Sequence, residues 1–438
     1  MQTMRYLNIM FFFLAVNVAA QDTIYRKIPV NELFELVENN NQQLKISQSF
    51  VRIASDRVGV AKNQRNPSIA ASANAYYLGD AYILDKDFAN GTSVSVPHFG
   101  NSFSLQASQL VFKGGALNNS VDIAELQEQI ARLNFSADKQ DIKFLVLGYY
   151  FDLLKLDRQR DAYLQNIKLA KIRLSNITKM SEQGMVTRND VIRNELLITN
   201  LTTAVKQIDN SIAIKNRQLG LAAGLEENVY IVPEQDILGN IPATASLESY
   251  LSSAYENYPD LKTARINTEI AEKNIKIAKA EKLPSLSLFA GNSLTRPLTS
   301  VQPALDMYSN GWQVGVGLNY NVSSLFNANK TIRLAQQQKE QANQYMEQLR
   351  QNVELDVTTS LIRFREANQV TAAAEKSLEL AQENLRIIDK KYANQLAILT
   401  EVMDAANARL EAELQKTNAE INILYAYYQI QRATGSLN

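Results

Sequence analysis

The sequence has no cysteine and a single histidine, His98. It therefore forms no disulfide, offers no thiol nucleophile or lipidation site, and cannot build a zinc or catalytic histidine cluster. Its 45 basic residues balance its 45 acidic ones, so charge gives no reason to expect a nucleic acid partner. No phosphate-binding glycine loop, nucleophile elbow or metal-ligand spacing is present. We expect no enzymatic activity, no metal and no cofactor.

Long hydrophobic runs are also missing after the first residues. Residues 1–20 combine Arg5, an apolar stretch from Leu7 to Val16, and the small residues Val18 and Ala20, which is the pattern of a secretory signal peptide. The apolar stretch is about half of the roughly 20 residues that a membrane-spanning helix needs. We therefore predict a cleaved signal peptide and an exported mature chain without a transmembrane helix.

Proline is absent from two long stretches, residues 98–232 and 304–438. An interior proline costs a helix about 3 kcal/mol, so these stretches permit very long helices. Apolar residues within them recur at spacings of three and four, as in Ile167, Ala170, Leu174 and Ile177, while the remaining faces are rich in Lys, Glu, Gln and Asn. The pattern predicts helices with a narrow apolar stripe and water on the other sides.

The chain carries a tandem duplication. Val51–Ile69 aligns with Thr268–Leu286 at a shift of 217 positions, and the stripe from Ile167 to Ile177 aligns with residues 378–388 at a shift of 211. Both halves predict one order: a helical stretch (31–62 and 246–282), a strand, a polar loop, a second strand and long helices. The predicted division is a signal peptide at 1–20, a first repeat at 21–225, a linker or equatorial segment at 226–245, and a second repeat at 246–438.

Four segments, uncharged apart from Asp80, alternate between apolar and polar residues, which is typical of strands with one dry face and one wet face. They lie at about 67–83, 99–112, 284–295 and 310–326. The clearest is the last, whose wet face is Gln, Gly and Asn. Most are as long as a tilted membrane strand, which takes about 9–11 residues. The dry face of the last strand consists of Trp312, Val314, Val316, Leu318 and Tyr320.

A soluble antiparallel sheet with one face on a core would show the same alternation. Its wet face would, however, normally recruit charged residues, which this chain has in plenty elsewhere. A sheet in lipid must close into a barrel, and four strands are too few, because the smallest such barrels have about eight. The residues therefore favour a membrane barrel shared between several chains, and the soluble sheet remains the alternative.

The signal peptide, the duplicated halves, the order of elements and the very long helices together resemble the TolC family of outer-membrane efflux proteins. The resemblance covers essentially the whole mature chain. Its sharpest motif is YANQLAILTEVMDAANARL, from Tyr392 to Leu410, with a weaker copy from Met180 to Leu196. It implies an α+β membrane protein of two tandem repeats, in which long helices form a periplasmic coiled-coil barrel. It also implies a homotrimer whose protomers each give four strands to a β-barrel of 12 strands in the outer membrane.

As a function, the resemblance implies the outer-membrane exit channel of a tripartite efflux system. A periplasmic adaptor and an inner-membrane pump would be its partners, with outer-membrane lipid around the strands and no nucleic acid. Two alternatives stay open at this point. One is the outer-membrane duct of a type I protein secretion system, and the other is a soluble periplasmic coiled-coil scaffold.

The resemblance also implies roles for residues of the motif. Glu401 and Asp404 match an acidic ring at the pore entrance; three positions apart, they share a helix face, and stacked carboxylates favour cations. Tyr392 and Asp190 match positions that latch the aperture. The two turns would dock the adaptor, and the dry face of residues 310–326 would face lipid. The docking residues are Gly184, Met185 and Val186 in the first turn, and Leu396, Ala397 and Ile398 in the second.

The motif departs from the family pattern at two positions. Ala397 stands where an arginine often completes the latch, and Gln395 replaces the glycine of the turn. Two outcomes are expected from these departures: a weaker latch network, or one that uses Arg188 or Arg193 in place of the missing arginine.

Overall fold

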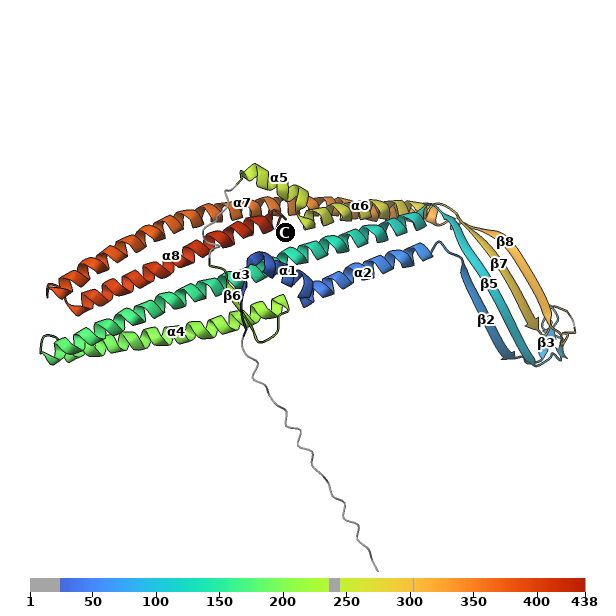
Figure 1. The fold of residues 1–438 in the computed structure, drawn as a ribbon. Coiled ribbons are helices and arrows are strands. Elements are labelled where there is room, and N and C mark those ends of the chain that lie inside the picture. The colour runs from blue at the N-terminus through green and yellow to red at the C-terminus, as the bar shows by residue number, and fades with distance from the viewer. Residues whose placement is uncertain (1–23, 236–244, 302, 438) are drawn as a thin grey trace, which may run out of the picture. The chain divides into compact units, whose positions relative to one another are not determined.

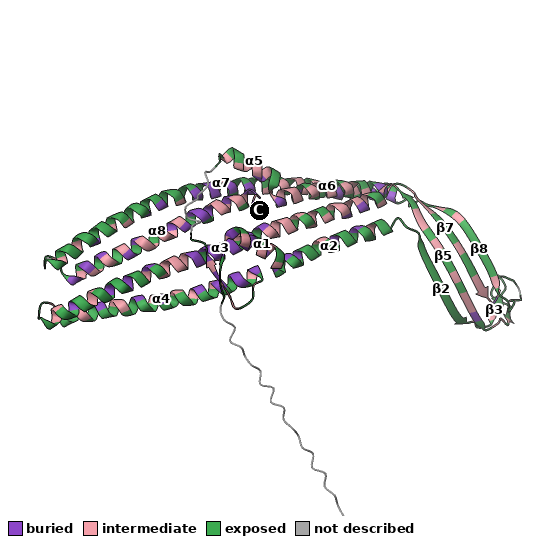
Figure 2. Ribbon diagram, viewed as in Figure 1, coloured by how far each residue is buried: buried purple, intermediate pink, exposed green. Residues whose placement is uncertain are grey.

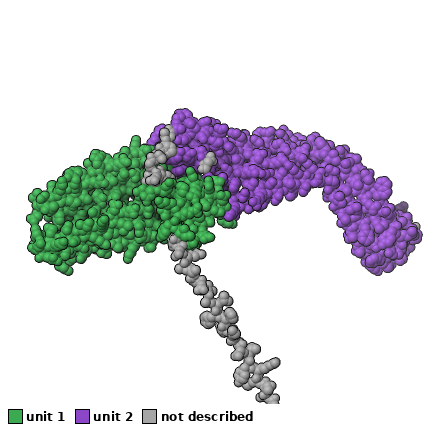
Figure 3. All heavy atoms as spheres, in the orientation of Figure 1, with its two compact units in different colours: residues 1–42, 145–241, 367–425 green, residues 43–144, 242–366, 426–438 purple. Residues whose placement is uncertain are grey.

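The computed structural model describes residues 24–235, 245–301 and 303–437 (Figure 1). The predicted signal peptide and residues 236–244 of the predicted linker lie outside this range. The chain packs as two compact units, each made of three chain segments (Figure 3). Unit 1 comprises residues 1–42, 145–241 and 367–425, and unit 2 comprises residues 43–144, 242–366 and 426–438. Both units draw on both repeats, so the compact units do not coincide with the duplicated halves.

The long helices that the missing prolines predict are present. α3 (Ala116–Glu182) has 67 residues and α7 (Ser324–Ala393) has 70, which corresponds to roughly 100 Å each. The other two of this kind are α4 (Arg188–Ala223) and α8 (Leu399–Ala433). None of the described helices combines the length and the hydrophobicity that crossing a bilayer requires.

The apolar stripes form the core of unit 1. Ile167 and Ala170 of α3 pack with Leu201 and Val205 of α4 and with Leu410 of α8. The remaining faces of these helices are largely exposed, as the green and pink ribbons in Figure 2 show. The predicted pattern of a narrow buried stripe on a wet helix is therefore confirmed.

Each of the two opening helical stretches is broken into two helices, where a single one was predicted. α1 (Val30–Asn40) is separated from α2 (Gln42–Asn63) by the extended residue Asn41, and α5 (Leu247–Asn257) from α6 (Pro259–Ala280) by the extended residue Tyr258. These two break residues are 217 positions apart. The second break has a local cause, because a residue before proline avoids the helical conformation. At the first, the Asn41 side chain donates to the Ala222 carbonyl at 2.8 Å.

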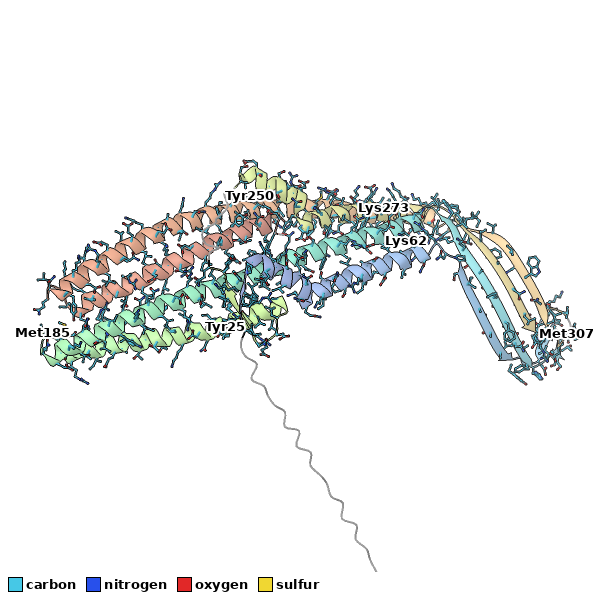
Figure 4. The ribbon with its side chains drawn as sticks, in the orientation of Figure 1. Tyr25, Lys62, Met185, Tyr250, Lys273 and Met307 are labelled. Carbon is cyan, nitrogen blue, oxygen red and sulfur yellow. The ribbon has the colours of Figure 1, made fainter. Side chains whose placement is uncertain are left out.

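In unit 2, α2 and α6 are each tied to α3 by an ion pair. The Lys62 Nζ lies 2.8 Å from a Glu125 carboxylate oxygen, and the Lys273 Nζ lies 2.5 Å from one of Asp122 (Figure 4). All four side chains are partly exposed, so these pairs fix position more than they add stability.

The four predicted strands form one antiparallel sheet in unit 2, in the order β2 (Ser68–Tyr77), β5 (Phe99–Lys113), β7 (Ser285–Arg296), β8 (Ser309–Asn319). Two predicted bounds are wrong. The first strand ends at Tyr77, and a separate hairpin of β3 (Ala81–Leu84) and β4 (Gly91–Val94) follows it.

The last strand also ends early, so Tyr320 lies beyond it. The cause is a turn at Asn321, whose side chain accepts from the Ser323 N–H at 3.2 Å and whose carbonyl accepts from the Ser324 hydroxyl at 2.6 Å. α7 begins at that serine, so the turn ends the strand and opens the helix.

The register sorts the sheet into two faces that continue across all four strands. Leu288 pairs with Val316, and Ala290 pairs with both Val314 and Ala107, so apolar residues lie beside apolar residues. We call this the apolar face and the opposite one the polar face. The apolar face includes Ile69, Ala71 and Ala73; Phe103, Leu105 and Ala107; Leu286, Leu288 and Ala290; and Trp312, Val314, Val316 and Leu318. The polar face includes Ser68, Ser72 and Asn74; Ser102, Ser104, Gln106 and Ser108; Ser287, Gly291 and Ser293; and Gln313, Gly315 and Gly317.

A parallel strand pair in unit 1 was not predicted from the sequence. β1 (Ile24–Ile28) pairs with β6 (Val229–Pro233), which are short segments without strong alternation. Their register is held by buried side chains rather than by pattern. The hydroxyl of the fully buried Tyr150 donates to the Ile28 carbonyl at 2.9 Å and accepts from the Glu234 N–H at 2.6 Å. Asn216 exchanges two hydrogen bonds with the Ile231 backbone.

Replacing Tyr150 with phenylalanine should loosen this strand pair. The change leaves the buried Ile28 carbonyl and the Glu234 N–H without their partner, and an unsatisfied buried group costs about 1–3 kcal/mol. We expect faster hydrogen–deuterium exchange in residues 24–28, measured by mass spectrometry on the purified protein. Tyr345→Phe, which removes an exposed hydroxyl from α7, is the control. Equal exchange in the two variants would contradict this role of Tyr150.

Candidate functional site at the helix tips

The chain reverses direction at two helix tips, which occupy equivalent positions in the two repeats. The first turn joins α3 to α4 and the second joins α7 to α8, 211 positions later. Equivalent positions are Gly184 and Gln395, Thr187 and Ile398, Asp190 and Glu401, and Arg193 and Asp404. The sequence-predicted site residues of the tips therefore fall on corresponding places of one motif.

Both turns close with the same backbone hydrogen bond. The Met185 N–H donates to the Met180 carbonyl at 2.9 Å, and the Leu396 N–H donates to the Lys391 carbonyl at 2.8 Å. This six-residue closure requires a left-handed residue just before the donor. Gly184 fills it with φ +72° and Gln395 with φ +60°. The second turn thus keeps the shape of a glycine turn without glycine and stores backbone strain there.

An acidic side chain caps the helix that follows each turn. Thr187 and Asp190 form a reciprocal capping box, in which the Asp190 carboxylate accepts from the Thr187 N–H at 3.0 Å and from its hydroxyl at 2.8 Å. Ile398 has no polar side chain, and only the second half of the box remains: its N–H donates to the Glu401 carboxylate at 3.1 Å. Negative charge in a first helical turn is also favoured by the helix dipole.

Tyr392 and Asp190 share one cleft between the tips, together with Arg193 and Thr400. No hydrogen bond joins Tyr392 to Asp190 in the described structure, and the buried Tyr392 hydroxyl has no partner there. The Asp190 carboxylate is engaged by Thr187 instead. Burial raises the pKa of Tyr392 above its ordinary value, and the negative charge of Asp190 adds to this.

The sequence did not reveal that the charge of Arg173 acts on Tyr392. Its positive charge opposes the rise in the pKa of Tyr392. Burial lowers the pKa of Arg173 itself, while Asp389 and Tyr392 act in the other direction. Arg173 directly precedes Leu174 of the predicted stripe, so only the packing of α3 against α7 brings it to the tyrosine. The sequence signal for Arg173 was its position one residue before Leu174, just outside the apolar stripe of α3.

One side-chain hydrogen bond links the two tips directly. Arg193 of α4 donates to the Thr400 hydroxyl of α8 at 3.0 Å. Ala397 has no group that could make such a contact. Of the two arginines named as substitutes from the sequence, Arg193 is therefore the one that bonds to the tip of the other repeat.

Polar side chains also join the helices behind the tips. The fully buried Asn194 of α4 donates to the Ala170 carbonyl of α3 at 2.9 Å, and Arg409 of α8 donates to Asn166 of α3 at 2.9 Å. Such bonds form in one register only, so they fix how far each helix extends at the tip.

The residues expected to bind partners lie on the surface of the tips. Met185, Leu396 and Ile398 are large apolar side chains with 51%, 76% and 66% of their area exposed, and Figure 4 labels Met185 at the end of its turn. Glu401 and Asp404 are also exposed, three positions apart on α8. Within the described residues, no group of three or more His, Cys, Asp and Glu side chains could hold a metal ion.

Substitutions at the equivalent positions 184 and 395 should have opposite effects on how fast the two turns open. Gly184→Ala should speed the opening of the first turn, because a left-handed alanine costs about 1–2 kcal/mol. Gln395→Gly should slow the opening of the second turn, because it removes the strain of a left-handed glutamine. The effect should be smaller than that of Gly184→Ala, because the greater freedom of glycine in the open chain offsets about 0.4–1 kcal/mol of the relief of strain. Hydrogen exchange of the Met185 and Leu396 amides measures both. If both substitutions changed the exchange rates in the same direction, the two turns would differ in conformation.

Comparison with known proteins identifies relatives over most of the chain. The sequence model of a family described as outer membrane efflux protein matches residues 33–225 and 250–436. The outer membrane efflux protein BepC of Brucella suis is 24% identical over 411 residues, covering 91% of this chain and 83% of the relative. The outer membrane protein TolC of Escherichia coli is 23% identical over 428 residues, covering 93% and 82%.

Solved structures show the same fold. The CmeC outer membrane channel of Campylobacter jejuni superposes with a TM-score of 0.75 at 16% identity, covering 93% of this chain and 85% of that one. The open state of the MtrE outer membrane channel of Neisseria gonorrhoeae gives a TM-score of 0.74 at 17% identity, covering 93% and 89%.

Proposed function

Because this chain belongs to the outer membrane efflux protein family, we propose that it is the outer-membrane exit channel of a tripartite efflux system that carries small molecules from an inner-membrane pump to the exterior. The family consists of outer-membrane efflux channels, which are conduits and not enzymes. The protein is accordingly an outer-membrane protein with a periplasmic helical extension. The alternative of a soluble periplasmic scaffold does not fit that location.

The observation that carries the proposal is the two-faced sheet with two open edges. β2 and β8 each pair on one side only, and four strands cannot close on themselves. Unpaired strand edges are not tolerated in lipid. β2 and β8 run in opposite directions, so β8 of one protomer can pair antiparallel with β2 of the next. In the proposed homotrimer three sheets of four strands close one barrel of 12, with the apolar face on lipid and the polar face on the pore.

The tips supply the proposed inner entrance. Glu401 and Asp404 of three protomers would form an acidic ring, since both are exposed on one face of α8. Tyr392 would latch the closed aperture with its buried, unpartnered hydroxyl, and the Arg193–Thr400 bond would hold the two tips of each protomer together. Met185, Leu396 and Ile398 would be the apolar contacts of the periplasmic adaptor.

Two neighbouring lysine substitutions test the barrel. Val314→Lys places a charge on the apolar face, which costs about 2–4 kcal/mol at the membrane midplane. Gln313→Lys, one residue away, places the same charge on the polar face. We expect the native mass of detergent-extracted protein from washed outer membranes to be that of three chains for wild type and Gln313→Lys, with strong loss of this species for Val314→Lys. A wild-type monomer that washes off without detergent would refute the proposed assembly.

Neutralising the acidic pair should weaken cation selectivity. Glu401→Gln with Asp404→Asn keeps the side-chain acceptor that caps α8 and removes only charge. We expect the reversal potential across a bilayer with a KCl gradient to shift toward zero. Glu411→Gln, which neutralises an exposed α8 residue further from the tip, should leave it unchanged. If the double variant keeps wild-type selectivity, Glu401 and Asp404 do not line the entrance.

A further inference from the structure

Two aromatic rings on the polar face lie across a glycine of the neighbouring strand. The Tyr76 ring of β2 covers Gly100 of β5, and the Phe289 ring of β7 covers Gly315 of β8. A Cβ added at Gly315 would lie 2.6 Å from the Phe289 Cζ, which is closer than such atoms approach, and a tight 3.0 Å from its Cε1. Gly315 does not have a left-handed backbone. The Phe289 ring, and not the backbone conformation, is therefore what favours glycine at position 315.

The Phe289 ring lies over a strip of β8 that has no side chains. On β8, Gly315 is directly opposite, and the next residue of that face is Gly317, whose added Cβ would lie 3.9 Å from the ring. On the other side, β5 presents Ser108 directly opposite, flanked by Gln106 and Leu110. Those side chains occupy the surface of β5. A methyl group at position 315 would fill the strip beneath the ring, and the ring would then stand higher above the polar face.

We infer that the pairing of Phe289 with Gly315 sets the bore of the channel within the β-sheet region. The inference rests on the proposed function, in which the polar face lines the pore and three protomers contribute one ring each. With glycine at 315 the three rings lie along the wall, and the lumen keeps its full width. With any larger residue they project into it and exclude bulky solutes. In the native protein Phe289 thus leaves the lumen open, and Gly315 is the residue that positions its ring.

Size exclusion from the outer mouth tests this directly. Neutral polyethylene glycols of graded mass are added only to the outer-mouth side of single channels in a planar bilayer. The largest polymer that lowers the conductance gives the width accessible from that side, independently of the tip entrance. We expect Gly315→Ala to lower this mass cut-off and Gly315→Ala with Phe289→Ala to restore it to at least the wild-type value.

Gly311→Ala is the matched control. Gly311 lies four positions away on the same strand and face, and an added Cβ there meets nothing within 4 Å. Its cut-off should equal that of wild type. Equal cut-offs for the Gly311 and Gly315 variants would overturn the inference while leaving the proposed channel intact, whereas a wild-type protein that forms no channel would refute the proposed function itself.

Assembly provides the second readout. If Gly315→Ala forms no trimer and the double variant does, the inference is also overturned, because the ring would then have no room to stand in the lumen. Trimers of normal yield with a reduced cut-off support it.

Discussion

The backbone of an open sheet in lipid must find partners, and much of this protein follows from that constraint. Each unsatisfied peptide group in hydrocarbon costs several kcal/mol. The edge strands β2 and β8 are 10 and 11 residues long and leave one side unpaired. The apolar face continues over all four strands, with one register shift between β5 and β7 at Leu110 and Phe112. In the proposed trimer each chain supplies one segment of the barrel wall, and three identical segments complete it.

The helical part answers a different requirement, because its helices keep water on most sides. Their buried stripes are narrow, so hydrophobic packing alone permits helices to slide by a turn. Buried polar contacts such as Asn194 with the Ala170 carbonyl and Arg409 with Asn166 remove that freedom. The tips are then fixed in length. That precision is useful where the proposed entrance depends on side chains of several helices meeting in one plane.

At the tips, structural and proposed functional roles fall on the same residues. Glu401 caps α8 and is also a member of the proposed acidic ring, and Asp190 caps α4 while its charge acts on Tyr392. The repeat explains this, because it placed an acid at the third position of both helices. Gln395 keeps the left-handed turn of Gly184 at some cost in strain. The first repeat therefore has the relaxed turn and the second the strained one.

Local sequence pattern determined the long helices, the buried stripes and the four strands. The absence of proline predicts the long helices, spacings of three and four predict the stripes, and alternation predicts the strands, because periodicity decides which face is buried. Strand ends, the Asn41 and Tyr258 breaks and the β1–β6 pair came only from the fold, since they depend on turns and buried partners distant in sequence. The same holds for the site. The motif located Tyr392, Asp190 and Glu401. Only tertiary structure brought Arg173 to Tyr392 and laid Phe289 on Gly315, because such contacts join elements whose spacing no single segment encodes.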